Sequence, residues 1–184
     1  MLLIILSLMI EALISSKTKI KLLLKFFLNS NNTSYLRSLE SEFGESTNGI
    51  RVELNKFEEA GLLKSNIIGN KKYFQADSTH PLFMDIHNIL LKITGLDTIV
   101  EKIIDNLGEL QHVFLVGQLA KGLNSEVIDL IFVGDIDKNY LYNVVQKVEK
   151  TINKKIRFVN YQSFEYSEEK FTEDYPDYLL LWSK

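Results

Sequence analysis

Three residues of one short segment, Gly117, Lys121 and Gly122, have the types that hold a phosphate group. Glycines leave backbone N–H groups accessible in a tight loop, and the lysine adds a positive charge. The loop follows an apolar run at 113–116 and precedes a second run that carries Asp129. These residue types allow an anion-binding loop between two strands. The interpretation that the sequence favours is that both glycines shape a turn and that Asp129 caps or bridges structure.

A second group of polar residues has the types that read duplex DNA. Arginine pairs bidentately with guanine and asparagine with adenine, whereas lysine commonly contacts phosphate. Arg51 and Asn48 lie in the first turns of an expected helix and are the predicted base readers. The full set of predicted DNA contacts is Thr47, Asn48, Arg51, Asn55, Lys56, Asn70, Lys71 and Lys72. The alternative is that Thr47 and Asn48 are capping residues and the two wing lysines are solvated charges.

Composition limits the other kinds of site. The chain has 184 residues, 46% hydrophobic and 24% charged, which is typical of one large or two small globular domains. It has no cysteine and three scattered histidines, so no metal site or cofactor is expected, and a reducing, cytoplasmic location is predicted. Residues 16–76 hold ten Lys and Arg against six Asp and Glu, and residues 77–184 hold eleven against seventeen. Only residues 16–76 are therefore expected to bind a polyanion.

The first fourteen residues, MLLIILSLMIEALI, are apolar apart from Glu11. They lack a basic start and a cleavage site, so no signal peptide is expected, and they are shorter than the roughly 20 residues that span a bilayer. No membrane partner is predicted. Either translation begins at Met9, or the segment extends the first helix and offers an apolar face to a partner subunit.

Periodicity and turn residues indicate the elements that position these groups. Helices are expected over 16–28, 33–43 and 46–60, followed by strands over 62–67 and 72–76 that the Gly69–Asn70 pair joins as a hairpin. Thr33 or Ser34 is expected to cap the second of these helices. After a boundary at 77–81, further helices are expected over 82–94, 97–110 and 139–153, and strands over 113–116, 127–133 and 156–159. The end of the chain, 164–182, is expected to be helical in part.

The order helix, helix, helix, hairpin is that of a winged helix-turn-helix. The run EEAGLL followed by GNKKYF within residues 36–76 resembles the winged-helix regulators of the ArsR and MarR type. The resemblance implies that the third helix enters the major groove and that the hairpin touches the adjacent backbone. One small module buries little surface, so a homodimer is expected, paired through the N-terminal helix or the helix around 83–91. Some winged helices bind protein instead, and Glu53, Glu58 and Glu59 keep that alternative open.

The segment VFLVGQLAKGLNSEVIDLIFVG, residues 113–134, resembles the minimal nucleotidyltransferase domain of the DNA polymerase β-like superfamily, and the resemblance extends over roughly 97–184. It implies a nucleotide site made of Gly117, Gln118, Lys121, Gly122 and Asp129. The family carries a serine after the first glycine, and this chain has Gln118 there.

The catalytic carboxylates of that family are incomplete in this sequence. Two aspartates one residue apart on a strand would face one side and share Mg²⁺. The position of the second aspartate is occupied by Asp129, but the position of the first is occupied by Val127. A third carboxylate is expected on the strand over 156–159, whose only charged residue is Arg157. Asp135 cannot substitute, because it lies roughly 20 Å further along an extended strand, and Asp137 lies beyond it. The resemblance therefore predicts a vestigial site with no catalytic residue and no enzymatic activity.

Together these features predict an α+β protein with three parts: a winged helix-turn-helix at 1–76, a linker helix at 77–96, and a small α/β nucleotidyltransferase-like domain with a mixed sheet at 97–184. The predicted function is a transcriptional regulator that binds double-stranded DNA, with the second domain serving as a sensor for a small-molecule or nucleotide effector, as a dimerisation module or as a partner-binding module. Two alternatives remain. One is a nucleotidyltransferase that modifies a protein or small molecule and regulates itself by DNA binding; the other is a protein-interaction adaptor.

Overall fold

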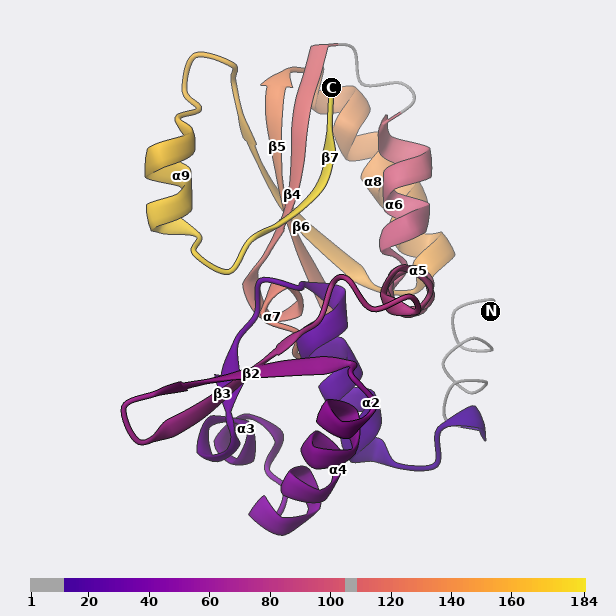
Figure 1. Cartoon of the computed structure of the whole chain (residues 1–184). Helices are drawn as coiled ribbons and strands as arrows, with labels where there is room; N and C mark the ends of the chain where they lie inside the picture. Colours follow the sequence, from indigo (N-terminus) through magenta and orange to yellow (C-terminus); the bar gives the residue numbers. More distant parts are fainter. Residues whose placement is uncertain (1–11, 105–108) are drawn as a thin grey trace.

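The structure, a computed structural model, describes residues 12–104 and 109–184. It has two stacked parts, the lower built on an antiparallel sheet and the upper on a mixed sheet. The helix α6 (Leu96–Ile104) runs up one side of the upper part, and α5 (Phe83–Thr94) lies where the two parts meet (Figure 1). The α+β class and the mixed second sheet agree with the prediction. The expectations for Met9 and for an apolar N-terminal face lie outside the described residues. In the described part of the chain, no helix combines the length and apolar character that crossing a membrane requires.

From Lys17 onward, the N-terminal part consists of helical segments and a three-stranded antiparallel sheet of order β1-β3-β2. Its elements are α2 (Lys17–Leu23), the π-helix η1 (Leu24–Leu28), β1 (Ser34–Tyr35), α3 (Leu36–Phe43), α4 (Thr47–Glu59), β2 (Leu63–Ile68) and β3 (Lys71–Ala76). Thr33 or Ser34 was predicted to cap α3, and this is wrong, because the residue before α3 is Tyr35 and both Ser34 and Tyr35 pair with β3. The first helix also differs from the prediction, because its last turn widens into η1.

Local sequence explains where α3 and α4 begin and end. The Ser46 hydroxyl accepts a hydrogen bond from the Gly49 N–H at 3.3 Å and caps α4. Gly44 ends α3 with φ +62°, a left-handed conformation that favours glycine. Ile50 and Leu54 are buried on the inner face of α4, which leaves its opposite face to solvent.

The C-terminal part places helices on both faces of a four-stranded sheet of order β6-β5-β4-β7, in which only β5 and β6 are parallel. Its elements are α5 (Phe83–Thr94), α6 (Leu96–Ile104), β4 (Glu109–Val116), α7 (Gly117–Ala120), β5 (Val127–Asp135), α8 (Lys138–Ile152), β6 (Lys155–Tyr161), α9 (Glu168–Asp174) and β7 (Leu179–Ser183). The helix predicted over 97–110 is described as far as Ile104, and it cannot extend to residue 110, because β4 begins at Glu109. β7 was not predicted.

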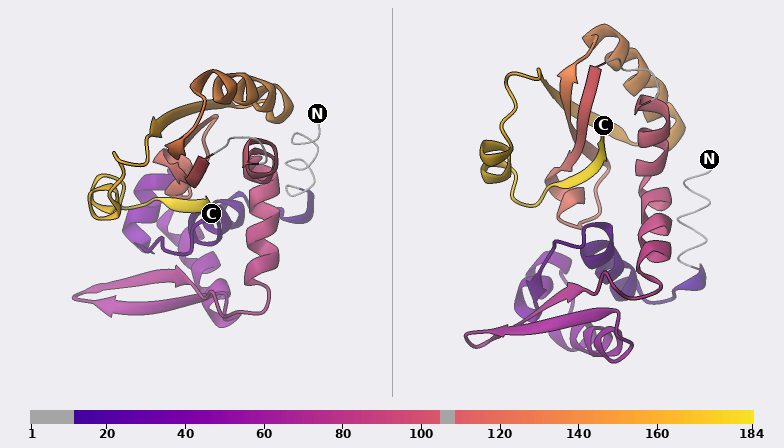
Figure 2. Two further views of the ribbon diagram at one scale, coloured as in Figure 1. Left: turned by 90° about the horizontal axis from the view of Figure 1, so that it is seen from above. Right: turned by 45° about the horizontal axis from the view of Figure 1, so that its top comes forward.

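Alternating side chains of the sheet fill two separate cores. Leu115 and Leu130 belong to the large core that also contains residues of α6 and α8. Phe114 and Ile131 point to the other face, where Phe171 of α9 covers them. Figure 2 shows α8 and α9 on opposite sides of the sheet.

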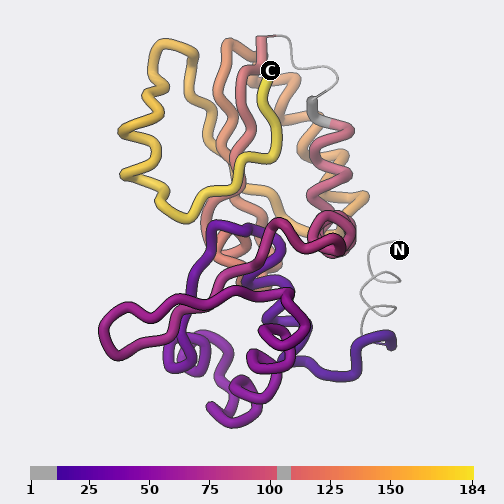
Figure 3. The backbone as a smooth tube through the Cα atoms, in the orientation of Figure 1, coloured from indigo at the N-terminus to yellow at the C-terminus, as the bar shows by residue number. Residues whose placement is uncertain are grey.

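The two parts of the chain share one continuous core. Its buried residues run from Leu22 to Ile156, so they come from both parts. Phe27 of η1 lies 5.8 Å from Phe83 of α5 between ring centres, and the Phe27 carbonyl oxygen lies 2.9 Å from Nδ1 of His87. The backbone trace shows the segment after η1 passing directly beneath the upper sheet (Figure 3).

Candidate functional site

A groove of about 460 Å³ lies between α4, the start of α3 and the β2–β3 hairpin. Its polar and charged lining consists of Arg37, Arg51, Asn55, Asn70, Lys71 and Lys72. Five of these were singled out from the sequence. Arg37 was missed, because nothing in the sequence shows that the second residue of α3 faces the same groove as α4.

The remaining predicted DNA contacts lie on α4 but outside this groove. Asn48 is exposed in the first turn and lies three residues before Arg51, on the same side of the helix. Thr47 is half-buried and precedes it. Lys56 is exposed and pairs with Glu53, with 3.7 Å between Nζ and Oε1. The helix cap is made by Ser46, so neither Thr47 nor Asn48 is committed to capping.

The two lysines of the hairpin differ in their surroundings. Lys72 donates to the Glu58 carboxylate at 2.6 Å, and this hydrogen bond, with a second from Ser65, lowers the pKa of Glu58. Lys71 instead lies over the ring of Tyr35, with Nζ 4.2 Å from the ring centre. An aromatic ring holds a cation without neutralising it. Lys71 therefore keeps its charge at the groove, whereas Lys72 shares its own with Glu58.

A larger cleft of about 610 Å³ lies in the C-terminal part, between α7, β5, β6 and the segment 174–178. Of the predicted nucleotide-site residues, Gly117, Lys121 and Asp129 line it. Gln118 and Gly122 do not; they line a separate hollow between the two parts of the chain. The opposite wall brings polar and aromatic residues that the sequence did not single out: Asp174, Tyr175, Asp177 and Tyr178. They were missed because they come from the end of α9 and the irregular segment before β7.

Asp129 is bound by an arginine from the neighbouring strand. Asp129 and Arg157 are paired across β5 and β6, and the arginine Nε donates to the carboxylate Oδ1 at 2.6 Å. The carboxylate raises the pKa of the exposed Arg157 guanidinium above its ordinary value. The other oxygen, Oδ2, lies 2.5 Å from the place that a Cβ on Gly117 would occupy. Gly117 has φ +73°, a left-handed conformation that favours glycine, and a Cβ there would also displace the carboxylate.

The residues of the cleft do not fit the divalent cation that the resemblance implies. Within residues 12–104 and 109–184, no group of three or more His, Cys, Asp or Glu side chains has an arrangement that holds a metal ion. Val127 stands where a second carboxylate would be, and Asp129 already faces a guanidinium. Lys121 faces Asp177 across the cleft, with 3.8 Å between Nζ and Oδ2. The cleft thus offers two cations, each beside a carboxylate that a phosphate oxygen can replace.

Comparison with known proteins finds matches among solved structures alone. No family model matches the chain, and no curated protein does. A mutant of the MntA–HpeT toxin–antitoxin pair is 19% identical, over 48% of this chain and 72% of that chain, with a TM-score of 0.39. The complex of the tri-AMPylated HEPN toxin of Shewanella oneidensis with its MNT antitoxin is 17% identical over 49% and 71%, with a TM-score of 0.37. A protein of Sulfolobus solfataricus assigned as a nucleotidyltransferase is 22% identical over 49% and 78%, with a TM-score of 0.32.

These matches correct one prediction. The incomplete carboxylates led to the expectation that the chain is not an enzyme, whereas one matched protein is assigned as a nucleotidyltransferase and another match contains an AMPylated toxin. The prediction of no enzymatic activity is therefore withdrawn. The similarity covers about half of the chain, and the activities belong to the matched proteins.

Proposed function

We propose that the chain binds duplex DNA as a winged helix and binds a nucleotide in the Asp129 cleft. One observation carries the DNA-binding proposal: the groove gathers Arg37, Arg51 and Lys71 with two asparagines, from α3, α4 and the hairpin. Among the described residues, no ion pair involves any of these three cations. A phosphate backbone is the partner that such a cluster attracts most strongly.

The exposed face of α4 supplies the groups that read bases. Asn48, Arg51 and Asn55 are exposed and follow one another at spacings of three and four residues, so they share a helix face. A recognition helix with this face in the major groove can place Arg51 on guanine and an asparagine on adenine. Lys71 and Lys72 then reach the phosphates beside the groove, which fixes position without reading sequence.

Salt-dependent binding to duplex DNA tests this proposal. Fluorescence anisotropy at 50 and 200 mM salt would compare the wild type with Lys71→Ala and with Lys147→Ala, a matched control on the exposed side of α8. We expect wild-type affinity to fall steeply with salt, Lys71→Ala to lower both affinity and salt slope (by about one unit), and the control to behave as the wild type. If the wild type does not bind at 50 mM salt, the DNA-binding proposal is refuted and a protein-binding adaptor takes its place.

The cleft has the groups that a nucleotide needs. Lys121 and Arg157 can exchange their carboxylate partners for phosphate oxygens, and Tyr175 and Tyr178 offer aromatic surface to a base. Isothermal titration with ATP would test this. We expect binding that Arg157→Ala weakens by about tenfold, the order of one charge-assisted hydrogen bond.

Nucleotidyl transfer in the same cleft is a second candidate function, favoured by the position of Asp129 beside both cation-bearing walls. In this reaction an acceptor hydroxyl attacks the α-phosphorus of a nucleoside triphosphate, and pyrophosphate leaves. Asp129 is placed to take the hydroxyl proton once Arg157 turns to the phosphates. Label from α-³²P ATP should then reach an acceptor and label from γ-³²P ATP should not, and Asp129→Asn should abolish the transfer. Equal labelling by both nucleotides would exclude nucleotidyl transfer.

We also propose that the chain forms a homodimer through α5. The side chains of Leu82, Met84 and Ile89 are 54%, 58% and 47% exposed, although all three are large and apolar. Contact with a second copy would remove this surface from water. Two copies would also bring two winged helices to two half-sites of DNA.

A further inference from the structure

Asn29, at the end of η1, is a fully buried polar residue of the N-terminal part that holds the cleft of the C-terminal part. Its side-chain Nδ2 donates to three carbonyl oxygens, those of Ala120 at 3.2 Å, Asp177 at 3.1 Å and Tyr178 at 3.1 Å. Its Oδ1 accepts from the N–H of Asn31 at 3.1 Å. Every polar atom of this side chain is thus engaged.

The three carbonyl oxygens belong to the two opposite walls of the cleft. Ala120 directly precedes Lys121, and Asp177 and Tyr178 form the wall that faces it. Lys121 and Asp177 are also the pair that meets across the cleft at 3.8 Å. One amide group from the N-terminal part therefore fixes the spacing of the residues between which a nucleotide must enter.

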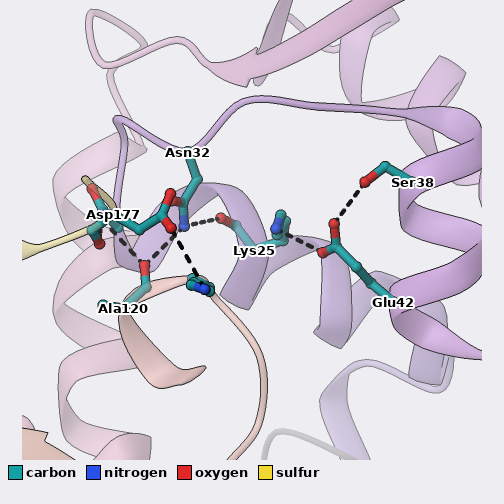
Figure 4. A network of polar contacts seen from close by, with 8 residues as sticks. Lys25, Asn32, Ser38, Glu42, Ala120 and Asp177 are labelled. Atoms are coloured by element: carbon teal, nitrogen blue, oxygen red, sulfur yellow. Dashed lines mark hydrogen bonds and ion pairs between the residues drawn. The ribbon is translucent and has the colours of Figure 1, made fainter. Parts of the chain in front are cut away.

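Two further contacts lock the Lys121 wall to the N-terminal part. Asn32 is 6% exposed, and its Nδ2 donates to the carbonyl oxygens of Lys25 and Ala120, both at 3.0 Å (Figure 4). Gly122 packs so closely that a Cβ there would lie 2.3 Å from the Lys25 Cα. This wall and the end of η1 must therefore move together.

The same segment, residues 25–32, also contacts the DNA-binding elements, and we call it the junction segment. Buried Lys25 pairs with Glu42 of α3, with 2.6 Å between Nζ and Oε2 (Figure 4). The side chain of Gln75, on strand β3 of the hairpin, donates to the carbonyl oxygen of Ser30 at 2.8 Å. The junction segment therefore joins the cleft to both sides of the DNA groove.

We propose that Asn29 is a positioning residue of the cleft and that, through the junction segment, nucleotide binding in the cleft weakens DNA binding at the groove. This inference rests on the proposed function. An amide has two hydrogens, and three oxygens compete for them, so one carbonyl can be released without leaving Asn29 unpaired. When a nucleotide separates Lys121 from Asp177, Asn29 can release one of these carbonyl oxygens, and the junction segment shifts. By linkage, DNA must weaken nucleotide binding by the same factor.

Anisotropy titrations of the full chain with duplex DNA, with and without saturating ATP, test the coupling. We expect ATP to raise the Kd for DNA of the wild type about fivefold or more, which is the usual size of such couplings. Gln75→Ala cuts the link to β3 and should keep ATP affinity while reducing the effect of ATP on DNA binding. Asn29→Ala should weaken ATP binding and abolish the effect, while DNA affinity without ATP is kept. Gln146→Ala, on the exposed side of α8, is the matched control.

The outcomes separate this inference from the function on which it rests. If both ligands bind the wild type and ATP leaves the Kd for DNA unchanged, or changes it equally in the wild type and in Gln75→Ala, the coupling is refuted and the proposed function stands. If ATP or DNA does not bind the wild type at all, the proposed function is refuted and the coupling is refuted with it. Should Asn29→Ala fail to fold, Gln75→Ala still decides between these results.

Discussion

At the scale of single residues, the roles of the cleft side chains depend on their neighbours more than on their types. Asp129 has the residue type of a catalytic carboxylate, yet the register of β5 and β6 sets it directly beside Arg157. Gly117 has the type of a phosphate-loop glycine, yet the Asp129 carboxylate lies where its Cβ would be. Sequence spacing located both residues in the cleft. It could not give their roles, because the partner comes from a strand 28 residues away.

The Glu58–Lys72 pair predicts a pH dependence of stability. Hydrogen bonds from Lys72 and then Ser65 lower the pKa of Glu58 from its ordinary 4.5. A carboxyl whose pKa is lower in the folded state stabilises the fold above its unfolded pKa, and this contribution is lost as pH falls through the folded pKa. The free energy of unfolding of the wild type should therefore decrease as the pH is lowered below about 4.5. In Lys72→Met, the same decrease in the free energy of unfolding should be smaller. Denaturant titrations at pH 7 and pH 3, with Lys147→Met as control, measure this; equal slopes in all three proteins would refute it.

At the scale of elements, the local signals were enough for most of the fold. Two helices end at Gly44 and Gly95, and the hairpin turns at Gly69. These positions follow from the neighbouring residues in the sequence, so they were predicted closely. The errors concern β1 and β7, whose existence depends on pairing with strands far away in the chain. The widening of the first helix into η1 was also missed.

The junction between α7 and η1 predicts a large effect of a single methyl group. Gly122→Ala should destabilise the fold by at least about 2 kcal/mol, because its Cβ would strike the Lys25 backbone at 2.3 Å and φ is +73°. Gly44→Ala is the control: φ is +62° there too, but nothing lies within 4 Å of the new Cβ, so about 1 kcal/mol is expected. Urea unfolding of both variants gives the two values. An equal decrease in the free energy of unfolding of both variants would mean that Gly122 does not pack against η1.

At the scale of the whole molecule, the two parts differ in charge and share one core. The basic groove belongs to the N-terminal part, and the cleft belongs to the C-terminal part, which holds eleven Lys and Arg against seventeen Asp and Glu from residue 77 onward. The charge difference was evident from the sequence. The shared core and the Asn29 contacts were not, because the buried asparagine lies in a polar loop sequence that reads as solvent-exposed.

The exposed apolar side chains of Leu82, at the N-cap of α5, and of Ile89, seven residues further along the helix, predict the oligomeric state. Sedimentation velocity at micromolar concentration should give a dimer for the wild type and a monomer for Ile89→Glu, since a buried unpaired charge would oppose the contact. Lys147→Glu, on exposed α8 surface, should stay dimeric. A monomeric wild type would refute pairing through α5 and would leave the groove to bind DNA as a single module.

Hydrogen–deuterium exchange of the full chain, with and without duplex DNA, locates the DNA-contact surface without mutation. We expect slower exchange on adding DNA in residues 47–59 of α4 and in the hairpin 63–76, and unchanged exchange in residues 138–152 of α8. Slower exchange confined to the C-terminal sheet, or none at low salt, would contradict the assignment of the groove as the DNA-binding surface.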